Sequence, residues 1–300
     1  MSTNAPRDLL TLTMDDGVKI AVRRGGNPNG TRLYLSNGNG FAIDGYRVFW
    51  EPLLADFDVI LFDMRNHGRN ELSGADGHHY FQMAKDIGTV FLGVDKALGH
   101  KPSVGVFHSM SGRAAMKHAV EMEKVWDALI LFDPPNVPPR GHEQYESMRI
   151  FELKLVEWAV ARQDHFASVE ELHSFFTANR AQSRWQPQAR EDMAKGILMP
   201  DGNGGFVLTC RRELEASIYL AALTLELWPE AKSFGMPVKL IGADPNAKGA
   251  SPTSAANAAL AREGGYEYEA VPETGHLLQI ERPDACREAM LSNLRKLGLV

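Results

Sequence analysis

The sequence has only two cysteines and no long apolar run. Cys210 and Cys286 lie far apart and outside any spacing typical of metal ligands, so neither a disulfide framework nor a cysteine metal site is expected. No stretch of about 18 uncharged apolar residues occurs, and the N-terminal MSTNAPRDLL is polar without an apolar segment behind it. We therefore expect no membrane span and no secretion signal, and a cytoplasmic location.

An excess of positive charge is also lacking. Lys and Arg number 32 against 38 Asp and Glu, a net charge of −6, and the basic residues are scattered without a run. Nucleic-acid binders normally carry a basic patch, so no nucleic-acid partner is expected. The remaining composition, 44% hydrophobic and 23% charged over 300 residues, is that of a globular chain with one large or two medium domains.

Short apolar runs alternate with stretches of helical period along most of the chain. The runs of strand type are LYLS, DVILFD, VGVFHS, ALILFD, VKLIGAD and YEYEAV, and residues 80–98 and 114–125 have helical periodicity. A hairpin around Asp16-Gly17 precedes them. Such alternation is typical of an α/β fold with a mostly parallel sheet that is buried on both faces by helices.

Residues 136–234 break this alternation. This interval contains no convincing strand, only helical stretches rich in Phe, Trp and Met, and prolines lie near both of its ends. We predict that it is an inserted α-helical cap, and that residues 1–135 and 235–300 form the core domain.

The segment HSMSG lies where a predicted strand runs directly into a helix. This is the context of a nucleophile elbow, in which a sharp turn projects the Ser109 hydroxyl from the top of the sheet. The N–H of the next residue, Met110, would then face a developing oxyanion at the helix N-terminus. The alternative is a strand followed by an ordinary serine N-cap.

A glycine-rich loop, NGNGF, follows the LYLS strand. Its glycines allow backbone N–H groups to face an anion, so Asn39 is a candidate for a second oxyanion donor. A Gly-x-Gly turn with a following strand that ends in Asp63 also imitates a dinucleotide fingerprint, but Ile43 stands where the third glycine belongs. We therefore expect no cofactor, and no metal.

His276 follows the last predicted strand. In chain order Ser109 comes first and His276 last, as in hydrolases with a Ser, acid, His order. Two carboxylates compete for the role of the acid. Asp244 ends VKLIGAD and Asp133 ends ALILFD, and each precedes a proline, so each is also compatible with a plain turn.

Four motifs together resemble the α/β-hydrolase superfamily: NGNGF, FDMRNHGRN, HSMSG and GHLLQIERP. The resemblance implies an eight-stranded, mostly parallel sheet, a helical cap after the sixth strand, and a Ser-His-acid triad of Ser109 and His276 with Asp244, or alternatively with Asp133. Two glycines of the family motif are replaced here, by Phe107 and Ser111. We expect the bulky Phe107 to crowd the elbow.

Serine as nucleophile selects the chemistry. Ser109, activated by His276, would attack a carbonyl and form an acyl-enzyme that water releases, with Asn39 and Met110 forming the oxyanion hole. We predict hydrolysis of a small to medium, largely apolar carboxylic ester, thioester or lactone. The alternatives are acyl transfer on the same triad and an inactive member of the fold that binds a small ligand. Association into a homo-oligomer is left open.

Overall fold

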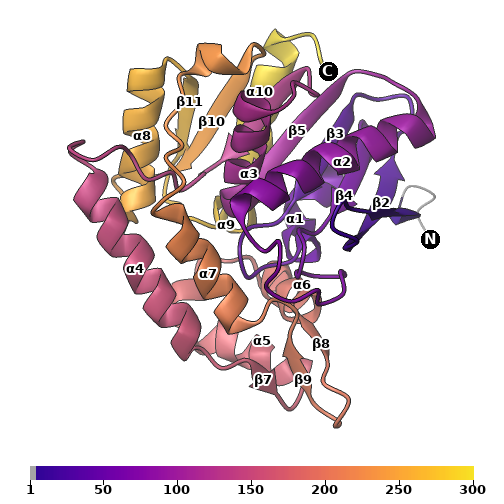
Figure 1. Ribbon diagram of the computed structural model, residues 1–300, viewed down its shortest axis with the longest axis vertical. Coiled ribbons are helices and arrows are strands. Elements are labelled where there is room, and N and C mark those ends of the chain that lie inside the picture. Colours follow the sequence, from indigo (N-terminus) through magenta and orange to yellow (C-terminus); the bar gives the residue numbers. More distant parts are fainter. Residues whose placement is uncertain (1–4) are drawn as a thin grey trace.

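The computed structural model describes residues 5–300, and within this range eight strands form one sheet in the order β1-β2-β4-β3-β5-β6-β10-β11 (Figure 1). Pairing between β3, β4, β5, β6, β10 and β11 is parallel, whereas β1 with β2 and β2 with β4 are antiparallel. The predicted eight-stranded, mostly parallel α/β sheet is thus confirmed. The strands are β1 (Arg7–Thr13), β2 (Lys19–Gly26), β3 (Arg32–Ser36), β4 (Asp58–Phe62), β5 (Ser103–His108), β6 (Ala128–Phe132), β10 (Val238–Ala243) and β11 (Glu267–Val271).

Successive side chains of the central strands point to opposite faces of the sheet and belong to two separate hydrophobic cores. On β6, Ile130 and Phe132 belong to one core, while Leu129 and Leu131 belong to the other. This alternation is the two-residue period of a strand, with both faces apolar because helices cover both. The helices outside residues 136–234 are α1 (Arg47–Trp50), α2 (Tyr80–Leu98), α3 (Ser109–Glu121), α8 (Pro252–Gly264), α9 (Leu278–Glu281) and α10 (Pro283–Lys296), with 3₁₀ turns η1 (Ile43–Tyr46) and η2 (Glu51–Ala55).

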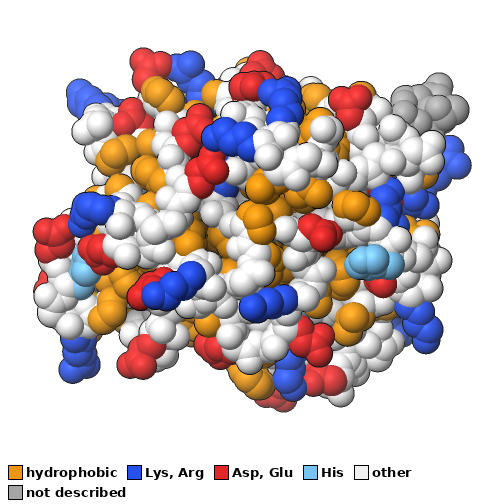
Figure 2. Space-filling model, turned by 90° about the horizontal axis from the view of Figure 1, so that it is seen from above, with side chains coloured by type: hydrophobic (Ala, Val, Ile, Leu, Met, Phe, Trp, Pro, Cys, Tyr) orange, Lys and Arg blue, Asp and Glu red, His pale blue; other side chains and the backbone are white. Residues whose placement is uncertain are grey.

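Helices α2, α3 and α8 cover one face of the sheet, and α1, α9 and α10 contribute to the core on the other. The carboxyl ends of the parallel strands point toward residues 136–234, called the insertion from here on (Figure 1). The face seen in Figure 2 lies at the opposite end, and there Lys and Arg are interspersed with Asp and Glu. Among residues 5–300, no helix is both long and apolar enough to cross a membrane.

The insertion lies between β6 and β10. Its elements are α4 (Tyr145–Ala161), β7 (His165–Phe166), α5 (Val169–Ala178), η3 (Arg180–Gln182), α6 (Pro187–Gly196), β8 (Leu198–Pro200), β9 (Phe206–Leu208), α7 (Arg212–Ala222) and η4 (Ala231–Phe234). The expectation that it contains no strand is wrong, because β7, β9 and β8 form a small antiparallel sheet. Strands of two or three residues are too short to show a periodic pattern.

The insertion is joined to the sheet by a continuous apolar core. Phe176, Trp185 and Met193 of the insertion belong to the same cluster as Phe49 and Trp50 of α1. Helix α6 packs closely against η1. The insertion is therefore fixed over the strand ends, where the candidate site lies.

Candidate active site

The turn between β5 and α3 holds Ser109 in a strained conformation. Its φ is 53°, in the left-handed region that side chains other than glycine rarely adopt. The neighbouring Ser111 stabilises this turn, because its hydroxyl accepts a hydrogen bond from the His108 N–H (3.1 Å) and lies 2.9 Å from the His108 carbonyl. The hydroxyl of Ser111 thus makes a local contact that glycine, usual at this position in the motif, cannot make.

The expectation that Phe107 crowds this turn is wrong. Its ring is fully buried in the sheet core and lies edge-on to Phe62 and Trp126, at centroid distances of 6.3 and 5.5 Å. Space for the ring comes from Gly105, where a Cβ atom would lie 2.6 Å from a ring carbon of Phe107. The bulk of Phe107 is therefore accommodated within the core rather than at the elbow.

Ser109, His276 and Asp133 form a chain of hydrogen bonds. The Ser109 Oγ lies 2.9 Å from His276 Nε2, and His276 Nδ1 lies 2.6 Å from Asp133 Oδ2. With Nδ1–H donating to the carboxylate, Nε2 is free to accept the serine proton. Ser109 is 7% exposed and Asp133 is fully buried. This is the geometry in which a histidine serves as base toward a serine hydroxyl.

The carboxylate of Asp133 is held on its second oxygen as well. Asp133 Oδ1 accepts hydrogen bonds from the Ala243 N–H (3.1 Å) and from Asn257 Nδ2 (2.9 Å). The carbonyl of His276 is in turn bonded by His108 Nε2 at 2.9 Å. The acid and the histidine are therefore both fixed by neighbours that do not take part in the Ser109 contact.

Asp244, expected as the partner of His276, is not in contact with it. Its carboxylate accepts hydrogen bonds from the N–H groups of Asn246 (2.8 Å) and Glu273 (2.9 Å), and these two, that of Glu273 foremost, lower the pKa of Asp244. The prediction that Asp244 pairs with His276 is wrong, and the alternative residue, Asp133, makes the contact. Asp244 instead anchors the loop that precedes His276.

The glycine-rich loop packs directly against the elbow. A Cβ atom at Gly38 would lie 3.2 Å from the Ser109 Cβ, so the close approach requires glycine there. Among the hydrogen bonds formed within residues 5–300, the backbone N–H groups of Asn39 and Met110 donate none, and Met110 is in the first turn of α3, where N–H groups have no intrahelical acceptor. Two N–H donors without an acceptor among the described residues therefore lie beside Ser109, one in the glycine-rich loop and one at the start of α3.

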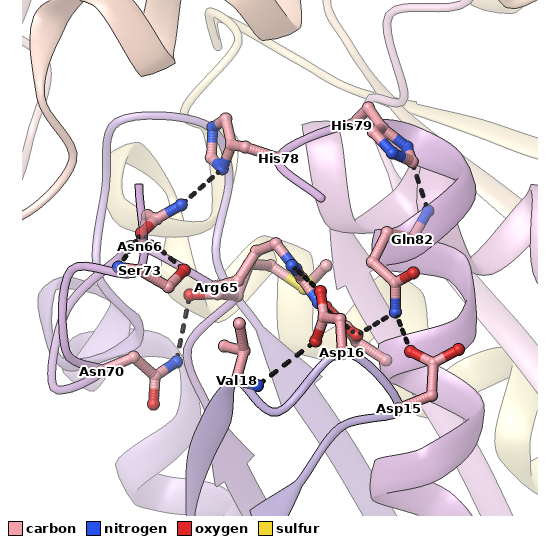
Figure 3. A network of polar contacts seen from close by, with 12 residues as sticks. Asp15, Asp16, Val18, Arg65, Asn66, Asn70, Ser73, His78, His79 and Gln82 are labelled. Carbon is pink, nitrogen blue, oxygen red and sulfur yellow. Dashed lines mark hydrogen bonds and ion pairs between the residues drawn. The ribbon is translucent and has the colours of Figure 1, made fainter. Parts of the chain in front are cut away.

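His67 anchors the glycine-rich loop. This role of His67 was not predicted from the sequence. Its Nε2 accepts the Gly40 N–H at 3.0 Å, and its Nδ1 bonds the Arg65 carbonyl at 2.8 Å. Burial lowers the pKa of His67 to about 4, so the imidazole stays neutral and able to accept. Arg65 itself is held by Asp86 and by Asp16, the second of which is seen in Figure 3. The only sequence signal was the position of His67 in the loop after β4.

Asp63, the acid of the imitated dinucleotide motif, is used inside the protein. Its carboxylate oxygens accept the N–H groups of Ile43 (2.7 Å) and Arg69 (3.1 Å), and the side chain is 2% exposed. It is committed to loop structure and does not face a ribose site.

Two buried ion pairs, one between the insertion and α3 and one within the insertion, were not expected from the sequence. Arg113 of α3 contacts Glu152 of α4, and Arg162 lies 2.6 Å from Glu215 of α7. Burial raises the pKa of both glutamates, while their arginine partners oppose that rise. Asn39 Nδ2 donates to the Glu215 carbonyl at 2.8 Å, which connects the second pair to the glycine-rich loop. The spacing of Arg113, four residues after Ser109 on one helix face, was the available signal.

An apolar cavity of about 300 Å³ lies within the insertion and reaches the glycine-rich loop at Phe41. Aromatic side chains form much of its wall: Phe41, Trp158, Phe166, Phe175, Phe176 and Trp185. Trp158 and Phe175 are 48% and 52% exposed, so they form its outer rim.

The family model described as "Alpha/beta hydrolase family" matches residues 33–289. The chain belongs to the alpha/beta hydrolase family. Its match covers the glycine-rich loop, the elbow, the insertion and His276. A search of curated protein sequences found no match.

Solved structures of hydrolases share the fold. A crystal structure of E-2-(acetamidomethylene)succinate hydrolase superposes with a TM-score of 0.77 at 17% identity, over 95% of this chain and 99% of that one. The enol-lactonase from Burkholderia xenovorans LB400 superposes with a TM-score of 0.66 at 19% identity, over 95% of this chain and 100% of the lactonase chain. The thioesterase domain from the curacin biosynthetic pathway superposes with a TM-score of 0.69 at 19% identity, over 96% of this chain and 100% of the thioesterase chain. At these identities the likeness concerns the fold.

Proposed function

We propose that this alpha/beta hydrolase is a serine hydrolase that cleaves a carboxylic ester, thioester or lactone through an acyl-enzyme on Ser109. The observation that carries the proposal is the hydrogen-bonded chain from Ser109 Oγ through His276 to the buried Asp133, at 2.9 and 2.6 Å. Such an arrangement serves to make a serine oxygen nucleophilic, and a serine N-cap does not require it.

The proposed reaction has two halves. Ser109 Oγ attacks the ester carbonyl carbon and its proton moves to His276 Nε2, while Asp133 stabilises the imidazolium. The carbonyl oxygen becomes an oxyanion, which the N–H groups of Asn39 and Met110 would bind. His276 then returns the proton to the leaving alkoxide. In the second half, His276 deprotonates a water, which attacks the acyl carbon and releases the acid and Ser109.

We also propose that the insertion acts as a cap that selects the substrate. The aromatic cavity begins at Phe41, in the same loop as Asn39, so an apolar part of the substrate placed there would lie beside the reacting carbonyl. The proteins of similar fold include an enol-lactonase, a thioesterase domain and a deformylase. These names support acyl chemistry as a class and no particular substrate.

A fluorophosphonate label tests the nucleophile, because it reacts covalently only with an activated serine. We expect wild type to be labelled on the peptide that contains Ser109, and Ser109→Ala to lose labelling and at least about a thousandfold of activity on short nitrophenyl esters, since nucleophile and base act as a unit. The melting temperature should barely change. Ser147→Ala, on the outer face of α4, is the matched control. Labelling of Ser111 in place of Ser109 would show that the elbow is assigned wrongly, and labelling without ester turnover would favour acyl transfer.

A further inference from the structure

Three polar side chains from three helices, α2, α3 and α4, meet on the insertion side of the proposed site. Arg113 Nη1 donates to the Tyr80 hydroxyl at 2.9 Å, and Arg113 Nη2 donates to Glu152 Oε1. Tyr219 of α7 contacts the second ion pair instead, because its hydroxyl lies 3.5 Å from Glu215 Oε1, and burial raises its pKa. Arg113, on the helix that begins at Ser109, is the residue that joins the other two.

The pair of Arg113 and Glu152 lies close to the catalytic groups. Arg113 is one helical turn after Ser109, on the same face of α3. Burial raises the pKa of Glu152, whereas the adjacent Arg113 lowers it. The contact with Arg113 thus places the Glu152 carboxylate of α4 next to the first turns of the helix that begins at Ser109.

The pair has bonding capacity that the described residues leave unused. Glu152 is fully buried, yet its Oε2 has no hydrogen-bond partner within residues 5–300. The same holds for Arg113 Nε, and for the Oδ1 of the buried Asn39 beside the elbow. An unpaired buried carboxylate oxygen costs free energy, so a site that keeps one is built to receive a donor.

The charge balance indicates which donor fits. Arg113 already compensates Glu152, and Arg162 compensates Glu215, so an added ammonium or carboxylate would be an uncompensated charge in a buried place. A neutral donor, such as a hydroxyl or a carboxamide N–H, satisfies Glu152 Oε2 without adding charge.

We infer that Glu152 is a specificity-determining residue whose free oxygen accepts a hydrogen bond from a neutral hydroxyl or carboxamide N–H on the substrate. This rests on the proposed function and deepens it, since the substrate then carries a polar group a few bonds from its scissile carbonyl in addition to an apolar part. Arg113 is the positioning residue that holds the carboxylate in place.

The test compares nitrophenyl esters in length-matched pairs: N-acetylglycine with pentanoate, N-acetyl-β-alanine with hexanoate, and N-acetyl-γ-aminobutyrate with heptanoate. In wild type at least one amide ester should be preferred about tenfold or more in kcat/KM, as expected for a hydrogen bond to a charged group. Glu152→Gln keeps an oxygen for Arg113 but loses the anionic acceptor, so this preference should disappear mainly through KM. Activity on the alkyl esters should persist. Glu157→Gln, exposed on the same helix, is the matched control.

Two further arms keep the outcomes apart. Binding of the amide methyl esters to Ser109→Ala, measured by calorimetry with and without Glu152→Gln, tests the subsite without any turnover. If Glu152→Gln does not fold, the volume-matched pair Arg113→Met with Glu152→Leu removes the subsite without an unpaired charge. A folded variant that keeps the wild-type selectivity and binding would show that the ion pair only holds the insertion in place. Absence of Ser109 labelling would instead count against the proposed function.

Discussion

Asp133 owes its place to the order of strands in the sheet. It directly follows β6, which pairs with β5 on one side and with β10 on the other, so its carboxylate lies next to the end of the strand that carries Ser109. Asp244 ends one strand farther away, and there its carboxylate serves two N–H groups of neighbouring loops. One residue therefore orients His276 itself, and the other holds the chain before it.

Replacing each acid by its amide separates these two roles. We expect Asp133→Asn to lower kcat by about 10³- to 10⁴-fold, since an amide next to Nδ1 favours the wrong tautomer of His276. Asp244→Asn should keep turnover within about threefold and lower the free energy of unfolding by about 1 kcal/mol, because one N–H bond is weakened. Ester kinetics and urea unfolding of both variants check this. A folded, active Asp133→Asn enzyme with an inactive Asp244→Asn would return the role of acid to Asp244.

Local sequence context was sufficient to predict that Ser109 and His276 lie close together, because the flanking strand and helix signals place both at the same edge of the sheet. It was not sufficient for the acid, because Asp133 and Asp244 have nearly the same local context and differ only in where their strands lie. Glu152 and Glu215 could not be found at all. In the sequence, a buried glutamate on a helix cannot be told from an exposed one, because its arginine partner is 39 or 53 positions away and only the fold brings the two together.

At the scale of elements, the insertion shows the same limit. Its helices follow from periodicity and its place between β6 and β10 from the prolines, but its small sheet depends on pairing between β7 and β9, about 40 residues apart. Two or three residues carry too little periodic signal, and only the partner strand makes them extended. The apolar cavity arises between α4, α5 and the glycine-rich loop, so no single segment encodes it.

The rim of this cavity provides a prediction for the insertion. Phe175→Ala or Trp158→Ala removes apolar contact that only longer acyl chains would reach, so kcat/KM for octanoyl esters should fall about tenfold while acetyl esters change little. Phe81→Ala is the matched control, because Phe81 is 50% exposed on α2 and does not line the cavity. Unchanged chain-length selectivity in both rim variants would mean that the cavity does not receive the acyl group.

For the whole molecule, the buried His67 makes the free energy of unfolding depend on pH. Its pKa is about 4 when folded, against the ordinary value of 6.5, because burial disfavours the imidazolium. As the pH falls below 6.5 the unfolded chain takes up a proton that the native state refuses, so this contribution to stability is complete above 6.5 and is lost toward pH 4.

The prediction concerns the difference in unfolding free energy between wild type and His67→Gln. The contributions of the other titrating groups cancel in this difference. Relative to His67→Gln, wild type should lose about 3 kcal/mol of unfolding free energy between pH 6.5 and pH 4, from about 1.4 kcal/mol for each pKa unit. Urea unfolding of both proteins across this range measures it. A difference that stays constant with pH would show that His67 is not kept neutral in the fold.

The insertion is not attached evenly. Helix α4 extends over 17 residues but buries only Met148, Glu152 and Ala159, and it leaves Ile150, Trp158 and Val160 exposed. By contrast, α6 buries its apolar side chains in the main core against η1 and α1. Local opening is easiest where the least apolar area is lost. Helix α4, which carries Glu152, would therefore lose less apolar contact than α6 on opening, and the buried contact between Glu152 and Arg113 is the polar interaction that such an opening has to break.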